Sequence, residues 1–301
     1  MQTVRMSFAP GEHLLSAWMR YNLRLGFAHL SFDRCLQYWK LPKQHLKSQR
    51  VSGEVTDTIV SQLAGSTEAR RSLLMCHTNY RLWLLSDDTG MLNQNLSVST
   101  GRPNLETNVL AFPVGWQLCS ECVAENRSVL GFSYWQRDHQ LPSVTHCLKH
   151  KAPLLTHDSL RKLHKLSLPQ SYLSLPLHAV DEVSELLEWS RFVSLVDRLI
   201  AENSTFPSLW REQVKKNLEL PHPVKHTHRP IYKALGEQME NSLGEVLLCH
   251  LFKAWKAPQM RKPNLLWMTL SGMSSSTLRH PVYWLVVLYW QREKLAGLGA
   301  S

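Results

Sequence analysis

Three cysteines and one histidine, arranged in two closely spaced pairs, are the residues of this sequence best suited to metal chemistry. Cys119 and Cys122 form a CxxC pair, Cys147 and His150 form a CxxH pair, and 24 residues separate the two pairs. Zinc favours four tetrahedral thiolate and imidazole ligands, and a two-residue spacing lets one tight turn direct both ligands at a single ion. The sequence therefore predicts one Zn²⁺ site with these four residues as ligands.

The predicted site has no vacant coordination position, because the protein itself supplies all four ligands. Catalytic zinc ions keep one position open for water or substrate, whereas closed sites hold a fold together. We therefore expect this zinc to be structural, and we expect its removal to unfold the segment around it.

Other groups in the sequence are weaker candidates for chemistry. His222, His226 and His228 could gather a second metal, but they occupy a proline-rich stretch without a nearby carboxylate, so solvated loop histidines are the simpler interpretation. Cys76 and His77 are adjacent on an expected helix, where neighbouring side chains diverge. Walker A, GxSxG and HExxH motifs do not occur in the sequence. The sequence thus predicts no catalytic residues and no enzyme.

The elements expected to position these ligands are mainly helical. Residues 10–26 predict a helix with an apolar face, and Arg20 and Arg24 are expected to point away from that face. The apolar face consists of Leu14, Trp18, Tyr21 and Leu25. Shorter helices are expected at 31–39, with Ser31 as N-cap, at 53–64 and at 67–77. Such short helices suit an N-terminal domain of the helix-turn-helix type.

The rest of the chain divides into further expected segments. Residues 92–115 are rich in Asn, Ser, Thr, Gly and Pro and read as irregular chain, whereas "FSYWQRDHQL" has the aromatic density of a strand. Helices are expected at 181–202, with a buried stripe, and at 231–256, with an apolar face. The stripe is Leu186, Val193, Val196 and Ile200, and the face is Ile231, Leu235, Met239, Leu243 and Val246. We predict a helical domain at 1–95, a zinc ribbon at 96–156 and a C-terminal helical domain at 157–301.

The chain is strongly basic, with a net charge of +10 and a pI near 9.4. Residues 1–50 hold eight Lys or Arg against two acids, and residues 251–301 hold seven against one. Such surfaces attract the phosphates of DNA or RNA, and Arg20, Arg24, Lys43 and Lys47 are candidate contributors. An ordinary solvated face is the alternative.

The sequence predicts a cytoplasmic protein. Its longest apolar run, at 281–290, has ten residues, whereas a membrane-spanning helix needs about 20, so the run predicts a buried helix or strand. Six cysteines, two of them in a CxxC, fit a reducing compartment with a metal site better than a disulfide scaffold.

Two stretches of the sequence resemble the TniQ/TnsD family of transposon target-selection proteins. The first comprises "CSEC", "YWQRDHQLP" and "CLKHKAPLL", in the order of that family's zinc region; the second is "PGEHLLSAWMRYNLRLG", with Ser16, Trp18 and Arg20. The resemblance covers roughly residues 8–156. Ser120 and Leu148 replace the prolines common in the family, and His139 stands where a second tryptophan is common. None of these departures removes a predicted ligand.

The resemblance implies a protein that marks where a transposon inserts and recruits an AAA+ ATPase regulator. Short members of CRISPR-associated transposons dock on an RNA-guided effector complex, often as a homodimer, and are expected on the nucleoid when bound to the target. Longer members of the TnsD type bind a specific DNA site directly. Because 301 residues is short for the TnsD type, the adaptor is the leading hypothesis and direct DNA recognition is the alternative.

The aromatic stretch between the ligand pairs permits two interpretations. Residues 135–138, "WQRD", could form a recognition surface, or Trp135 could pack beside the metal centre with Arg137 and Asp138 in a salt bridge. The structural interpretation is favoured because tryptophans between zinc ligand pairs usually pack inward.

Overall fold

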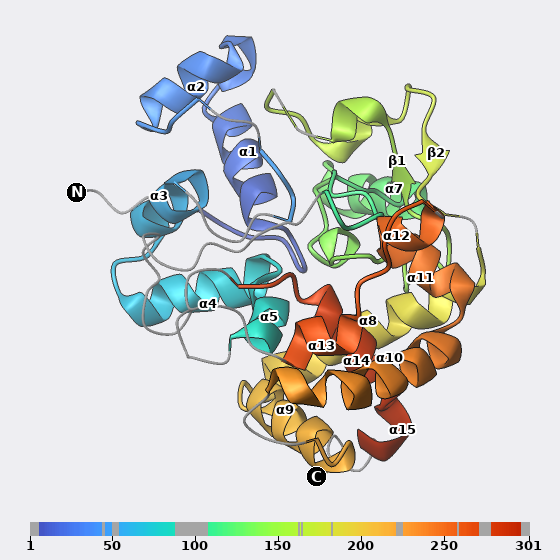
Figure 1. Cartoon of the computed structure of the whole chain (residues 1–301). Helices are drawn as coiled ribbons and strands as arrows, with labels where there is room; N and C mark the ends of the chain where they lie inside the picture. The colour runs from blue at the N-terminus through green and yellow to red at the C-terminus, as the bar shows by residue number, and fades with distance from the viewer. Residues whose placement is uncertain are drawn as a thin grey trace. The chain divides into compact units, whose positions relative to one another are not determined.

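The computed structural model describes most of the chain and is mainly helical (Figure 1). It describes residues 6–43, 46–49, 54–87, 108–161, 163, 165–181, 183–220, 225–257, 259–270 and 278–295. Over these residues, strand is confined to an antiparallel pair, β1 (Leu155–Thr156) and β2 (His178–Ala179), which confirms the expected fold class. The predicted boundary between residues 95 and 96 lies outside the described ranges.

The described residues form two compact units, each with its own core. The first unit contains the described residues up to Tyr80 and those of Pro113–Ser190. The second contains the described residues between Arg81 and Phe112 and those from Arg191 onward. The predicted metal ligands all belong to the first unit.

The first unit is built from short helices and extended connections. Its N-terminal helices start at side-chain caps where the sequence offers them: His13 caps α1, Ser31 caps α2 as predicted, and Ser66 caps α4. The elements of this unit are α1 (Leu14–Arg24), η1 (Phe27–His29), α2 (Phe32–Tyr38), α3 (Glu54–Leu63), α4 (Thr67–His77), α7 (Ser120–Leu130), η3 (Asp138–Gln140), β1, η4 (Asp158–Leu160), η5 (Pro169–Tyr172) and β2.

The buried face of α1 differs in part from the predicted one. Leu14 and Trp18 are fully buried as expected, but Leu25 is exposed at the end of the helix. Arg20, expected to point outward, is buried, whereas Arg24 is exposed. The prediction for Arg20 was wrong because hydrophobic periodicity does not register a buried ion pair.

Arg20 is buried because it neutralises the equally buried carboxylate of Glu12. Its Nη2 lies 2.7 Å from Glu12 Oε2 and its Nε 3.1 Å from Oε1, a two-pronged contact. Ser16 Oγ and the amide of Ala9 also donate to the carboxylate. Every strong acceptor site of Glu12 is therefore used inside the protein.

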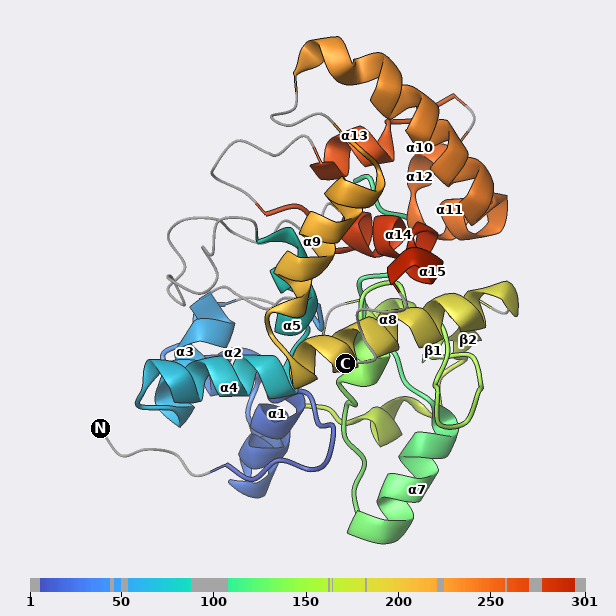
Figure 2. The same cartoon turned by 90° about the horizontal axis from the view of Figure 1, so that it is seen from below.

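The second unit is a set of helices around an apolar core (Figure 2). Here α10 packs against α13 and α14, and α13 packs against α14. Its elements are α5 (Tyr80–Trp83), η2 (Leu84–Ser86), α8 (Glu185–Glu202), which starts in the first unit, α9 (Phe206–Asn217), η6 (His226–His228), α10 (Arg229–Leu243), α11 (Glu245–Leu251), α12 (Lys253–Lys256), α13 (Leu265–Leu270), α14 (Val282–Trp290) and α15 (Arg292–Leu295).

Two predictions for this part of the chain are confirmed. All four residues of the expected stripe on α8 are buried: Leu186, Val193, Val196 and Ile200. The apolar run at 281–290 forms α14, which is buried from Val282 to Leu288. Among the described residues, no helix is both long and apolar enough to cross a bilayer.

The helix predicted for 231–256 is wrong as one continuous element. Gly244, with φ of +77°, ends α10, and extended Phe252 separates α11 from α12. Met239 and Leu243 of the predicted face are buried as expected, but Ile231 and Val246 are exposed, and Tyr232 and Gly236 complete the buried face of α10. On this face Gly236 allows Asn264 to approach closely, because a Cβ at position 236 would lie 3.1 Å from the Asn264 amide.

Replacing Arg20 with methionine tests the buried ion pair. Arg20→Met leaves the Glu12 charge buried without its partner, which costs about 3–5 kcal/mol of the free energy of unfolding. Arg24→Met, one turn later on the exposed side of α1, should cost less than about 1 kcal/mol. Chemical denaturation of the zinc-loaded chain measures both, and equal losses would contradict the role assigned to Glu12 and Arg20.

The buried histidine His13 makes stability depend on pH. Its Nδ1 accepts from the amide of Leu15 and its Nε2–H donates to the carbonyl of Ser48, so the neutral ring caps α1. Burial lowers the pKa of His13 from 6.5 to about 3; the Ser48 carbonyl opposes this shift, and the nearby Arg137 and His77 reinforce it. Between pH 6.5 and about 3, the imidazole of His13 is protonated in the unfolded chain but not in the folded one. The free energy of unfolding therefore decreases as the pH falls below about 6.5.

The expected slope is about 1.4 kcal/mol for each pH unit below 6.5. His13→Asn keeps a capping side chain but cannot be protonated, so its free energy of unfolding should fall less steeply over the same range. Denaturation of both proteins at pH 7.0 and at pH values down to about 5.5 measures the difference. Parallel curves would show that His13 does not carry this dependence.

Candidate metal centre

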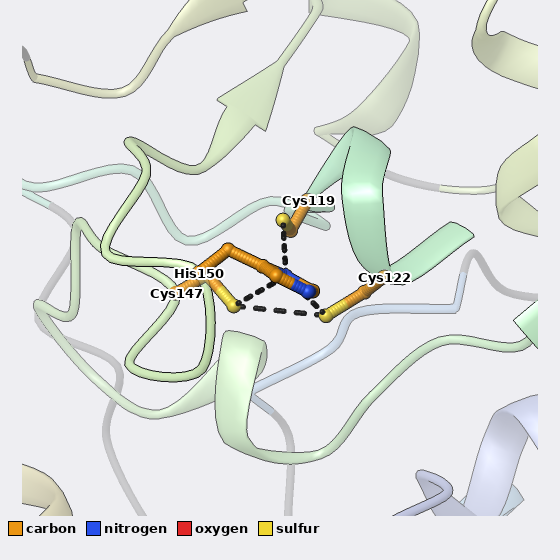
Figure 3. Close-up of side chains that lie close together, drawn as sticks. All are labelled: Cys119, Cys122, Cys147 and His150. Carbon is orange, nitrogen blue, oxygen red and sulfur yellow. Dashed lines mark hydrogen bonds between the residues drawn. The ribbon is translucent and has the colours of Figure 1, made fainter. Parts of the chain in front are cut away.

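The two predicted ligand pairs meet in one cluster (Figure 3). Cys119 is the residue before α7 and Cys122 lies in its first turn, while Cys147 and His150 flank a turn that follows η3. One ligand-type atom from each residue lies within 4.8 Å of all the others. The three cysteines are buried, and His150 is nearly so.

Local backbone structure explains why each pair points inward. A helix that begins directly after Cys119 places Cys122 almost one turn further on, beside it. At the second pair, Lys151 adopts a φ of +55°, which reverses the chain, and the amide of Cys147 donates to the carbonyl of Ala152 at 2.9 Å. Both ends of the segment are thus fixed by backbone structure.

The distances within the cluster match a tetrahedral zinc site. Zinc bonds of about 2.3 Å to sulfur and about 2.0 Å to nitrogen imply sulfur–sulfur separations of about 3.8 Å and sulfur–nitrogen separations of about 3.5 Å. Cys122 Sγ lies 3.6 Å from Cys147 Sγ. His150 Nδ1 lies 3.4, 3.3 and 3.6 Å from the sulfurs of Cys119, Cys122 and Cys147. The cluster could therefore hold a metal ion such as zinc.

The electrostatics of the cluster also favour a cation. Hydrogen bonds from Cys119 and Cys122 lower the pKa of Cys147, and hydrogen bonding with Cys119 and Cys147 raises the pKa of Cys122. One thiolate therefore forms readily, whereas a second is opposed by the first. A divalent cation at the centre removes this opposition, as thiolate coordination requires.

His150 is oriented from outside the cluster by Glu125 of α7. His150 Nε2 donates to Glu125 Oε1 at 3.0 Å, and Lys149 pairs with the other carboxylate oxygen. The hydrogen bond to Glu125 raises the pKa of His150 to about 9, burial opposes the shift, and the Cys119 and Cys147 sulfurs add to it. Neither Glu125 nor Lys149 was singled out from the sequence.

Between the ligand pairs the structure contains the helix α7, which the sequence did not predict, and no strand where one was expected. The stretch "FSYWQRDHQL" forms no named strand and contributes only an isolated bridge between Gln136 and Glu12, followed by η3. Because α7 carries both Cys122 and Glu125, missing this helix also meant missing the residue that orients His150.

The stretch around Trp135 is structural, as favoured from the sequence. Trp135 is fully buried, its Nε1 donates to the carbonyl of Ser167, and its ring packs beside Trp116. Arg137 is buried, donating to the carbonyl of Thr78 and pairing with Asp138. These side chains are committed to packing, which removes Trp135 and Arg137 from the exposed surface.

The same stretch joins the metal segment to α1. The amide of Trp135 donates to Ser16 Oγ, the amide of His13 donates to the carbonyl of Trp135, and the amide of Arg137 donates to the carbonyl of Gly11. The two stretches that carry the sequence resemblance are therefore hydrogen-bonded to each other.

Neither rival group forms a metal cluster among the residues that the structure describes. Among the described residues, the cluster of Cys119, Cys122, Cys147 and His150 is the one group of three or more potential ligands brought together. His222 and the side chain of His226 lie outside what the structure describes, and His228 accepts from the amide of Lys225. His77 stacks on Phe8 and donates to the carbonyl of Glu12, which gives it a structural role.

Zinc removal should unfold the metal segment locally. We expect the purified chain to carry one zinc ion per molecule, and chelation to abolish hydrogen-exchange protection across residues 119–150 while α10 stays protected. Cys147→Ser should lose the zinc, whereas Cys76→Ser, which alters an exposed cysteine, should keep it. Unchanged protection after chelation would contradict a structural metal.

Comparison with known proteins identifies a family whose matched region contains the metal cluster. The TniQ family model matches residues 3–154, a stretch that includes α1 and all four residues of the metal cluster. No curated protein matches the chain. Because the match spans half of the 301 residues, the chain belongs to the TniQ family, whose members are non-catalytic transposition proteins.

Proposed function

We propose that this protein selects the insertion site of a transposon as a non-enzymatic adaptor. One surface binds an RNA-guided CRISPR effector complex, and another binds the AAA+ ATPase regulator of the transposon. The protein acts in the cytoplasm, on the nucleoid when the effector is bound to its target. Family membership supports a transposition target-selection role, and the adaptor mechanism is the finer proposal that we add.

We also propose that Cys119, Cys122, Cys147 and His150 ligate one structural Zn²⁺. The bound ion would neutralise the thiolates and fix the turn at 147–150 against the start of α7. With four protein ligands it offers no position to a substrate, so it supports the scaffold and performs no reaction. We likewise keep, as a prediction, the division of the chain into a helical domain at 1–95, a zinc ribbon at 96–156 and a C-terminal helical domain at 157–301.

The observation that carries the adaptor proposal is the burial of the family's characteristic residues. Glu12, Ser16, Trp18 and Arg20 are inside the first unit, as are the three cysteines. Residues committed to packing and metal binding leave recognition to the surrounding surface. A protein organised in this way acts by presenting surfaces to partners.

The helix α10 argues against direct reading of DNA, which is the alternative. It does expose Lys233, Gln238 and Asn241, residue types that contact base edges. However, Lys233 lies 3.9 Å from Glu237 one turn away, and Glu237 is itself exposed. An exposed carboxylate on the contacting face would be repelled by DNA phosphates.

Two of the four predicted basic contributors near the N-terminus are paired with carboxylates. Arg20 is paired with Glu12 in the interior, and Lys43 is paired with Asp33 at the surface, 2.9 Å away. Of the four predicted contributors, Arg24 is exposed and Lys47 half-buried. The attraction of these four residues to phosphates is therefore weaker than that of four unpaired, exposed cations.

Binding to a duplex DNA pool separates the two functions. We expect the zinc-loaded protein to bind DNA weakly, without sequence preference, and to lose this binding at moderate salt. It should instead bind an RNA-guided CRISPR effector complex. Enrichment of one DNA sequence that survives moderate salt would overturn the adaptor proposal in favour of direct recognition.

A double variant on α10 provides the matched control. Lys233→Ala combined with Gln238→Ala removes two exposed side chains without touching the buried face of the helix. The adaptor proposal expects binding to the effector complex to be unchanged. Loss of a selected DNA sequence in this variant would place base recognition on α10.

A further inference from the structure

Glu125 is the one carboxylate that contacts a member of the cluster, among the described contacts. It follows Cys122 by three residues on α7, which brings it to the same side of the helix. Its Oε1 accepts from His150 Nε2 at 3.0 Å, and its Oε2 pairs with Lys149. Each oxygen of this side chain therefore holds one residue of the turn that carries His150.

The hydrogen bond decides which imidazole nitrogen faces the cluster. A neutral imidazole has one N–H and one lone pair, and a metal binds the nitrogen with the lone pair. Because Glu125 accepts a proton from Nε2, the lone pair is left on Nδ1, the nitrogen within 3.6 Å of all three sulfurs. The same bond restrains rotation of the ring.

Exposure separates this interaction from an ordinary surface ion pair. Glu125 is 43% exposed and Lys149 65%, so their mutual attraction alone stabilises the protein little. His150 is only 10% exposed, and its ring joins the partly solvated carboxylate to the buried sulfurs. The effect of Glu125 is therefore expected in metal affinity more than in the fold.

We propose that Glu125 is the positioning residue of the metal centre, holding His150 in the tautomer and orientation that present Nδ1 to the ion. This inference rests on the proposed zinc site. Lys149 supports the arrangement by fixing the second oxygen of the carboxylate. Carboxylates that orient a ligating histidine typically contribute 10–100-fold to metal affinity.

The test compares the zinc dissociation constants of full-length variants, measured by competition with a chromogenic chelator. Glu125→Ala removes the acceptor and should weaken zinc binding about 10-fold or more. Glu125→Gln keeps an accepting oxygen without the charge and should recover part of the loss. Glu121→Ala, an exposed acid in the first turn of the same helix, is the matched control and should leave the constant unchanged.

Nitrogen-15 NMR of the zinc-loaded proteins supplies the second readout. Wild type and Glu125→Gln should show a His150 ring protonated at Nε2 and metal-bound at Nδ1, and Glu125→Ala should lose this uniform state. Unchanged affinity and ring state in Glu125→Ala would overturn the positioning role. Equal weakening in Glu121→Ala would reduce it to a general charge effect. A wild-type chain that binds no zinc would overturn the zinc assignment itself.

Discussion

Convergence of three thiol sulfurs and one imidazole nitrogen within 4.8 Å is the constraint around which much of the first unit is organised. Without a cation, one buried thiolate opposes the next, so the segment from Cys119 to His150 has a strong electrostatic reason to bind metal. Because the protein supplies all four ligand atoms, we propose that an ion bound there would have a structural role. Such an ion would hold α7, the turn after Cys147 and the intervening stretch together, and it would perform no reaction.

The scaffold extends from the metal segment to α1 through backbone hydrogen bonds. Ser16, whose hydroxyl donates to Glu12, also accepts from the amide of Trp135, so the buried ion pair and the metal segment share one residue. Both stretches lie within the residues that the TniQ family model matches.

The sequence predicted the clustering of these four residues better than the structure around them. Ligand spacing identifies Cys119, Cys122, Cys147 and His150 because zinc imposes a short-range geometry, and caps such as Ser31 act within a few residues. By contrast, the pairing of Arg20 with Glu12 and that of Glu125 with His150 depend on tertiary structure, which periodicity does not report. The aromatic density near Trp135 predicted a strand. This prediction failed because the stretch is buried by packing between segments and not by pairing in a sheet. The break at Gly244 shows that one glycine can outweigh a continuous apolar pattern.

X-ray absorption at the zinc edge tests the central claim most directly. Full-length protein loaded with one equivalent of zinc should show three sulfur neighbours at about 2.3 Å and one imidazole nitrogen at about 2.0 Å. That result would establish a closed structural centre made by the four clustered residues. An oxygen neighbour, or fewer than three sulfurs, would reveal an open or different site and contradict the account of a purely structural metal.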